Sequence, residues 1–207
     1  MTVLPRARRL DVTDLARVAV FAGILAVLGL PGSFTVLGAV PITAQTLGVM
    51  LAGAVLGPWL GALSVTVFLA LVTAGLPLLA GGRGGIGVFF GPSAGYLPGW
   101  ILGALVIGLI VHAGHRKPVT WRTLVGVIVG GIVVVYALGI PIQSVVTRLP
   151  LGETALTSLV FVPGDLAKAV IATTVVMTLL RANPRAFRRT WPTKAPEDVP
   201  AEPVRQR

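Results

Sequence analysis

The amino-acid sequence predicts an all-α integral membrane protein, a bundle of six transmembrane helices with both termini in the cytoplasm. Composition, hydropathy and the placement of the basic residues lead to this prediction. Of the 207 residues, 55% are hydrophobic and only 12% are charged, which is about half the charged share of a soluble domain. The mean hydropathy is +0.90. A chain of this length cannot bury so much apolar surface in one core, so the surplus is expected to face lipid.

Six apolar segments, extended by their flanks, approach the roughly 17–25 residues that span a bilayer. They are Leu15–Leu30, Ile42–Leu56, Trp59–Gly75, Ala94–Val111, Leu124–Ile142 and Leu159–Leu180. The Gly57-Pro58 pair breaks the chain between the second and third. The first follows an arginine-rich segment, as a signal peptide would. It continues into further membrane-grade sequence without a convincing cleavage site, so we expect a retained span.

The basic residues predict the orientation of this bundle. With the N-terminus inside, the inner segments hold three basic clusters, within residues 6–17, 116–122 and 181–189, whereas the outer loops hold only Arg83 and Arg148. Basic loops lie on the cytoplasmic side. This placement beside apolar spans also argues against nucleic acid as the partner of the net charge of +10. We expect a cytoplasmic segment at 1–14, a transmembrane substrate-binding domain at 15–182 and a disordered cytoplasmic tail at 183–207.

Asp165 and Lys168 are the clearest polar candidates, because both lie at the head of the sixth apolar span. Their spacing of three places them on one face of a helix, and Pro163-Gly164 just before them suits a helix start. Charges inside a membrane cost about 2.5–3.5 kcal/mol each on insertion scales and commonly have a function. We interpret the pair as a ligand site. The alternatives are a self-neutralising ion pair near the outer interface, or an Asp165 that only stabilises the N-terminus of the helix.

A glycine-rich connection between the third and fourth spans is the second candidate. Because glycine allows unusual backbone conformations, this connection can approach a ligand closely. The candidate residues in it are Gly81, Gly82, Arg83, Gly84 and, at its end, Tyr96. A merely flexible loop is the alternative. The formal dinucleotide fingerprint within it is rejected, since no βαβ unit surrounds it.

Thr43 and Gln45 enter the second span from the outer side, where they can bind a ligand or join helices. All these polar groups converge on the outer half of the bundle, which predicts an outward-facing pocket.

Catalysis is not expected, because the sequence contains no nucleophile with a base, no carboxylate pair and no phosphate-binding loop. It contains no cysteine. His112 and His115, without a carboxylate partner, make a poor metal site and are expected to be solvated. We therefore expect neither a metal nor a cofactor.

Small residues recur in the first span at four-residue intervals, with Ala19 and Gly23 in one row and Ala22 and Ala26 in another. Such rows allow close packing of helices. Packing inside the bundle and docking of another protein are equally compatible with them.

Five stretches of the sequence resemble the BioY family. In chain order they are PITAQTLGVMLAGAVLGP at 41–58, AGLP at 74–77, GGIGVFFGP at 84–92, GYL at 95–97 and PGDLAK at 163–168. BioY proteins are the biotin-binding, substrate-specific membrane subunits (S subunits) of energy-coupling-factor (ECF) transporters. The resemblance covers about Leu15 to Leu180.

This resemblance implies a six-helix bundle that binds biotin near its extracellular face, with Asp165, Lys168 and the Gly81–Gly85 loop at the site. Family members often carry Asn or Ser in this loop, where this chain has Gly81 and Arg83. The resemblance also implies that small residues of the first helix, matched by Ala22 and Ala26, contact a transmembrane coupling subunit, and that two ATP-binding subunits supply the energy. An S subunit for another vitamin, such as thiamine or riboflavin, is the main alternative. A membrane enzyme or structural membrane protein is a weaker one.

Overall fold

The fold is all-helical in the part of the chain that the computed structural model describes, which comprises residues 11–30, 43–113, 117–184 and Phe187. The helices α1 (Val12–Val27), α2 (Gln45–Leu56), α3 (Pro58–Thr73) and α4 (Tyr96–Val111) are short. Gly57 has a φ of 82° and Pro58 occupies the first turn of α3, so this pair ends one helix and starts the next, as the sequence predicts.

Two longer helical rods complete the bundle. The first contains α5 (Thr120–Ile128), a π-helical turn η3 (Val129–Val134) and α6 (Val135–Thr147); the second contains α7 (Leu151–Ser158), a 3-10 turn η4 (Leu159–Phe161) and α8 (Val162–Ala182). They are 28 and 32 residues long and, by length and composition, are the two helices in the described ranges that could cross a membrane alone. Helices α2, α3 and α4 are apolar but shorter.

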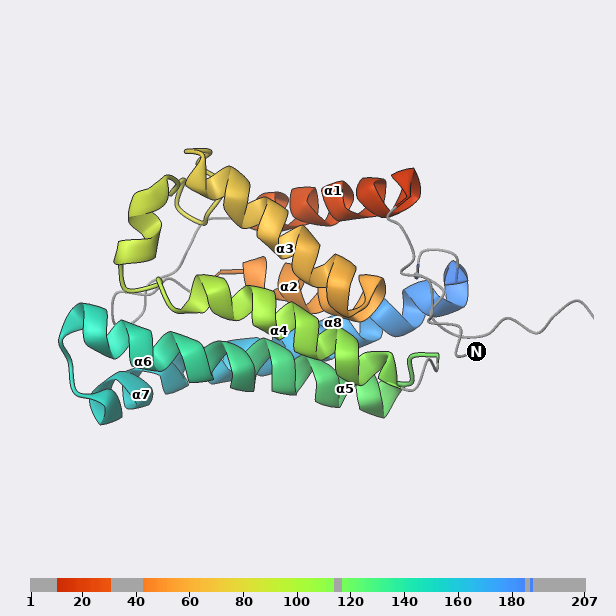
Figure 1. Ribbon diagram of the computed structural model, residues 1–207. Coiled ribbons are helices and arrows are strands. Elements are labelled where there is room, and N and C mark those ends of the chain that lie inside the picture. The colour runs from red at the N-terminus through yellow and green to blue at the C-terminus, as the bar shows by residue number, and fades with distance from the viewer. Residues whose placement is uncertain (1–10, 31–42, 114–116, 185–186, 188–207) are drawn as a thin grey trace, which may run out of the picture.

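Helix α4 lies at the centre of the bundle and contacts α2, α3, α5, η3 and α6 (Figure 1). Glycines allow these close contacts. A Cβ on Gly53 would lie 2.5 Å from the carbonyl oxygen of Ala104, and one on Gly103 would lie 2.6 Å from that of Gly130. Gly53 in α2 and Gly103 in α4 therefore serve close packing between helices inside the chain.

The bundle is apolar on its outside and polar at selected points inside. Large side chains such as Val145, Leu156 and Trp59 are 78%, 70% and 72% exposed, whereas Gln45 and Asp165 are 1% and 5% exposed. Exposed apolar side chains together with buried polar ones are typical of a protein surrounded by lipid rather than by water.

Figure 1 places two of the predicted outer connections at one end of the bundle. The segment between α3 and α4, which contains a 3-10 helix η1 (Ile86–Phe90), lies at the same end as the α6–α7 connection. The α4–α5 connection lies at the opposite end.

Three expectations about these elements need correction. Residues 143–158 were expected to be largely an outer loop, but α6 and α7 continue through them and leave only 148–150 outside helices. Helix α1 begins at Val12 rather than at residue 15. Phe187, in the expected tail, is 1% exposed and belongs to the core; the rest of that tail beyond residue 187 lies outside the described residues, as does Ile42.

Candidate ligand-binding site

A cavity opens between the loop that follows α3 and the helices α2, α4, α6 and α8. Its empty space, including open solvent at its mouth, is about 610 Å³. Its lining residues are Thr43, Gln45, Thr46, Leu79, Arg83, Ser93, Tyr96, Leu97, Trp100, Val135, Tyr136, Phe161, Asp165 and Lys168.

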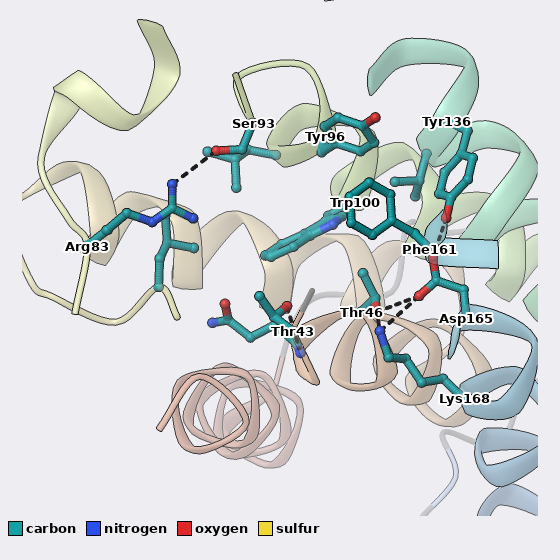
Figure 2. A pocket seen from close by; sticks show the side chains of 14 residues that line it. Thr43, Thr46, Arg83, Ser93, Tyr96, Trp100, Tyr136, Phe161, Asp165 and Lys168 are labelled. Atoms are coloured by element: carbon teal, nitrogen blue, oxygen red, sulfur yellow. Dashed lines mark hydrogen bonds and ion pairs between the residues drawn. The ribbon is translucent and has the colours of Figure 1, made fainter. Parts of the chain in front are cut away.

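Asp165 and Lys168 form one end of the cavity (Figure 2). Lys168 Nζ lies 2.9 Å from Asp165 Oδ1 and donates to Thr46 Oγ1 at 3.0 Å. The Thr46 hydroxyl is 3.4 Å from the same carboxylate oxygen, and the Tyr136 hydroxyl donates to Asp165 Oδ2 at 2.6 Å. The pair is thus fixed by three helices, since Thr46 lies in α2, Tyr136 in α6 and the two charged residues in α8.

The expected helix start at Pro163-Gly164 is only partly observed. Asp165 does lie in the first turn of α8, but η4 and α7 precede that turn directly. The N-terminus of α8 is therefore not an isolated helix end, and the carboxylate is held by Lys168, Tyr136 and Thr46.

Arg83 forms the other end of the cavity, on the opposite side of Figure 2. Its Nε donates to the carbonyl oxygen of Ala80 at 3.3 Å and its Nη1 to Ser93 Oγ at 3.3 Å. Both acceptors are neutral. Burial lowers the pKa of Arg83 from its ordinary value, but a guanidinium stays charged in proteins. This end of the cavity therefore has a positive charge that these acceptors leave uncompensated.

Aromatic rings lie between the two ends. Trp100 and Phe161 separate Arg83 from Asp165 in Figure 2, and the rings of Tyr96 and Tyr136 meet edge to face with centroids 6.2 Å apart. The Tyr96 hydroxyl donates to Gln143 Oε1 at 2.8 Å and so is engaged in a hydrogen bond to α6. The middle of the cavity is mainly apolar.

Thr43 and Gln45 line the cavity as expected, but the Gln45 amide is engaged in contacts within the protein. Its Nε2 donates to the carbonyl oxygens of Leu25 and Leu78, and its Oε1 accepts from the backbone N–H of Ala80. Thr43 Oγ1 accepts from the backbone N–H of Gln45 at 3.3 Å.

The predicted loop glycines shape the backbone rather than line the cavity. Gly81 and Gly82 have φ of 80° and 69°, a left-handed conformation that favours glycine. Gly84 lies against the carbonyl group of Leu76, where a Cβ would clash. These residues build the turn that presents Arg83, and direct ligand contacts from them stay a prediction.

Tyr136, Trp100, Ser93 and Phe161 line the site but were not singled out from the sequence. Tyr136 is one of two tyrosines in the chain and directly follows three consecutive valines, a signal that was available. Ser93 and Phe161 lie next to predicted polar segments and have no signal of their own.

The small-residue rows of α1 divide between two faces. Ala19 and Gly23 are exposed and Ala26 is half-buried, but Ala22 is 5% exposed and packs inside the bundle. This corrects the expectation that Ala22 contacts a partner. The docking face that α1 can offer includes Ala19 and Gly23.

His112 was expected to be solvated, which is wrong. It is buried at the end of α4 and its Nε2 lies 2.9 Å from the carbonyl oxygen of Ala54 in α2. Burial, assisted by the positive charge of Arg122, lowers the pKa of His112. His115 lies outside the described residues.

Comparison with known proteins gives four findings about this chain. The model of the BioY family matches residues 4–185. The chain is 45% identical over 179 residues to a protein of Rhodobacter capsulatus named biotin transporter BioY, covering 82% of this chain and 94% of that protein. It is 45% identical over 174 residues to a probable biotin transporter BioY of Bacillus subtilis, covering 84% and 93%. This chain is also similar to the crystal structure of the S-component for biotin from an ECF-type ABC transporter, with a TM-score of 0.76 and 36% sequence identity. The similarity covers 82% of this chain and 92% of the S-component chain.

Proposed function

This chain belongs to the BioY family, and from that membership we propose that it is the biotin-binding S subunit of an ECF-type transporter. It is a membrane protein with a role in transport rather than catalysis. The relatives named as biotin transporters and the similar biotin S-component support biotin as the substrate. The observation that decides in favour of ligand capture is a cavity with a carboxylate and an ammonium at one end and a guanidinium at the other.

The Asp165–Lys168 end has capacity for the ureido group of biotin. An ionised carboxylate offers about four lone-pair positions and an ammonium three donors. Asp165 uses three positions, on Lys168, Thr46 and Tyr136, and Lys168 uses two donors, on Asp165 and Thr46. By this count one acceptor position of Asp165 and one donor of Lys168 remain. A ureido group supplies the matching N–H and C=O, and hydrogen bonds to charged groups are the strong ones.

The Arg83 end suits the carboxylate of the same ligand. Its guanidinium binds only neutral oxygens through the contacts described above, and a guanidinium matches a carboxylate geometrically. The apolar rings between the two ends then cover the bicyclic ring system and the aliphatic chain of biotin. Binding contributions from Thr43 and Tyr96 are part of this proposal.

We further propose the topology and partners of the subunit. Six helices span the membrane, with both termini in the cytoplasm and the cavity facing outward. The basic clusters support this orientation. A transmembrane coupling subunit would dock on the exposed small residues of α1, and two ATP-binding subunits would supply the energy. Neither partner would contribute to the ligand cavity.

Isothermal titration of the purified subunit in detergent tests the function. Biotin is expected to bind saturably at one site without ATP. Biotin methyl ester, which lacks the negative charge, is expected to bind more weakly, and the Arg83→Gln variant is expected to lose that preference. Saturable binding of thiamine or riboflavin with no binding of biotin would overturn the proposal.

A further inference from the structure

Gln45 connects three parts of the chain that are distant in sequence. It is the first residue of α2 and is 1% exposed. Its Nε2 donates to Leu25 at 3.1 Å and to Leu78 at 3.0 Å, and its Oε1 accepts from the N–H of Ala80 at 3.1 Å. A side-chain amide has two donors and one carbonyl oxygen. Both donors are used on protein atoms, so the amide is better placed to hold the protein together than to bind a ligand.

Each hydrogen bond of the Gln45 side chain is formed with a backbone group that has no partner within a helix. Leu25 lies in the last turn of α1, where carbonyl oxygens have no partner further along the helix. Leu78 and Ala80 lie in the connection after α3, where no helix satisfies their backbone groups. Gln45 therefore joins both the end of α1 and the connection after α3 to the start of α2. Loss of these hydrogen bonds would leave buried polar groups without partners, which is energetically costly.

The clamped loop leads directly to Arg83. Leu79, between the two clamped residues, forms two backbone hydrogen bonds with Arg83, its N–H donating at 3.0 Å and its carbonyl accepting at 3.2 Å. Gly81 and Gly82 close this tight turn. The Arg83 side chain donates back to the carbonyl oxygen of Ala80. The position of the guanidinium is thus set by the backbone of 78–80, which Gln45 fixes.

We propose that Gln45 is a positioning residue, which fixes the loop at residues 78–83 so that Arg83 points into the cavity. This inference rests on the proposed function in that the Arg83 guanidinium meets the ligand carboxylate. It replaces the prediction that Gln45 itself binds the ligand.

Gly29 offers an independent way to disturb the same clamp. A Cβ added to it would lie 2.6 Å from the carbonyl oxygen of Leu78 and 2.9 Å from Gln45 Nε2. Contacts this short force a shift. Gly87 lies in the same connection as the clamped loop, yet a Cβ added there meets nothing within 4 Å. Gly87→Ala is therefore a matched control for Gly29→Ala.

Hydrogen exchange of the ligand-free subunit tests the clamp without reference to biotin. In Gln45→Met, which keeps the length of the side chain but not its polar atoms, amides of residues 78–83 are expected to exchange at least tenfold faster, because local opening sets their rate. Gly29→Ala is expected to show the same change and Gly87→Ala none. Gln143→Met removes another buried amide, one that bonds Tyr96 instead, and is expected to leave exchange of this loop unchanged. Wild-type exchange of the loop in both Gln45→Met and Gly29→Ala would overturn the proposal.

A double-mutant cycle on biotin affinity tests the positioning role itself. Gln45→Met is expected to weaken binding roughly tenfold or more, in the range for losing a hydrogen bond to a charged group. In an Arg83→Gln background the same change is expected to have little further effect, because the residue that it positions is gone. Equal effects in both backgrounds would mean that Gln45 acts on binding independently of Arg83 and would contradict the proposal. If the wild-type subunit binds no biotin, the proposed function fails, while the exchange experiment still decides whether Gln45 holds the loop.

Discussion

At the scale of single residues, the site depends on how Asp165 is held. Its carboxylate accepts from Lys168, Tyr136 and Thr46, and these groups come from three different helices. A buried charge needs such partners, because desolvation otherwise costs several kcal/mol. The same partners leave room for one more donor, so the arrangement that stabilises the charge also orients it toward a ligand.

Replacing Tyr136 by Phe is expected to weaken biotin binding about tenfold or more, since a hydrogen bond to a charged group contributes about 1.5–3 kcal/mol. The measurement is the dissociation constant by titration calorimetry in detergent. Thr173→Val is the control, because Thr173 is also a buried hydroxyl on the bundle interior but donates to Ala169 within α8. Unchanged affinity in Tyr136→Phe would mean that its hydroxyl does not orient the carboxylate in the complex.

The sequence indicated the charged residues of the candidate site and Tyr96, but not its apolar residues or its other aromatic residues. Asp165, Lys168 and Arg83 could be predicted because a charge in an apolar segment is rare and needs a reason. Trp100 and Phe161 could not, since aromatic residues are ordinary in a membrane helix and only the folded bundle brings these two, from α4 and η4, to the same cavity. Gln45 was identified, but its polar partners are backbone atoms far away in sequence, which no local pattern indicates.

At the scale of elements, the irregular segments decide where the side chains point. The π-helical turn Val129–Val134 directly precedes Val135 and Tyr136, which line the cavity. Such turns change the register of a helix and often occur at functional sites. The six apolar segments could be predicted from hydropathy, whereas the π-helical turn and the continuation of α6 and α7 through residues 143–158 could not, because they depend on contacts between helices.

Gly103→Ala tests the packing beside this turn. The added Cβ would lie 2.6 Å from the carbonyl oxygen of Gly130, and overpacking of this kind costs about 1–3 kcal/mol. The melting temperature in detergent is expected to fall. Gly152→Ala, where a Cβ meets nothing within 4 Å, is expected to leave it unchanged or raise it slightly. Equal melting temperatures for the two variants would show that α4 and η3 are less tightly packed than described.

His112 connects the end of α4 to α2, and its burial makes this contact sensitive to pH. Its pKa is lowered in the folded protein, so below the ordinary value of about 6.5 the unfolded chain binds a proton more readily than the folded one. Stability is therefore expected to fall as the pH drops below about 6.5. The measurement is the melting temperature from pH 8 to pH 5, and His112→Gln should flatten the profile. An equally steep profile in His112→Gln would assign the effect to other groups.

At the scale of the whole molecule, the chain places its polar chemistry at one end of an apolar bundle. The glycine-rich connection with Arg83 and the α6–α7 connection lie at that end in Figure 1. Lys117 and Arg122, two members of the second basic cluster, lie at or next to the α4–α5 connection at the opposite end, and a basic connection is the pattern of a cytoplasmic face. The cavity, at the end of the bundle that carries the Arg83 connection, would then open to the outside of the cell, where a scarce vitamin has to be captured.

The absence of cysteine from the sequence makes this orientation easy to test. Lys117 and Gly152 are exposed residues in the α4–α5 connection and in α7. A membrane-impermeant maleimide is expected to label Gly152→Cys in intact cells, and Lys117→Cys only after permeabilisation. The opposite pattern would invert the topology.

The binding of biotin by the purified wild-type subunit and by Asp165→Asn tests the central claim most directly. The substitution removes the negative charge that Lys168 pairs with and that the ureido N–H is proposed to meet. Affinity is expected to fall on the order of 100-fold, within the cost of losing one partner of a buried charge pair. Glu153→Gln, an exposed carboxylate in α7, is expected to bind as the wild type does. Wild-type affinity in a folded Asp165→Asn variant would contradict the account.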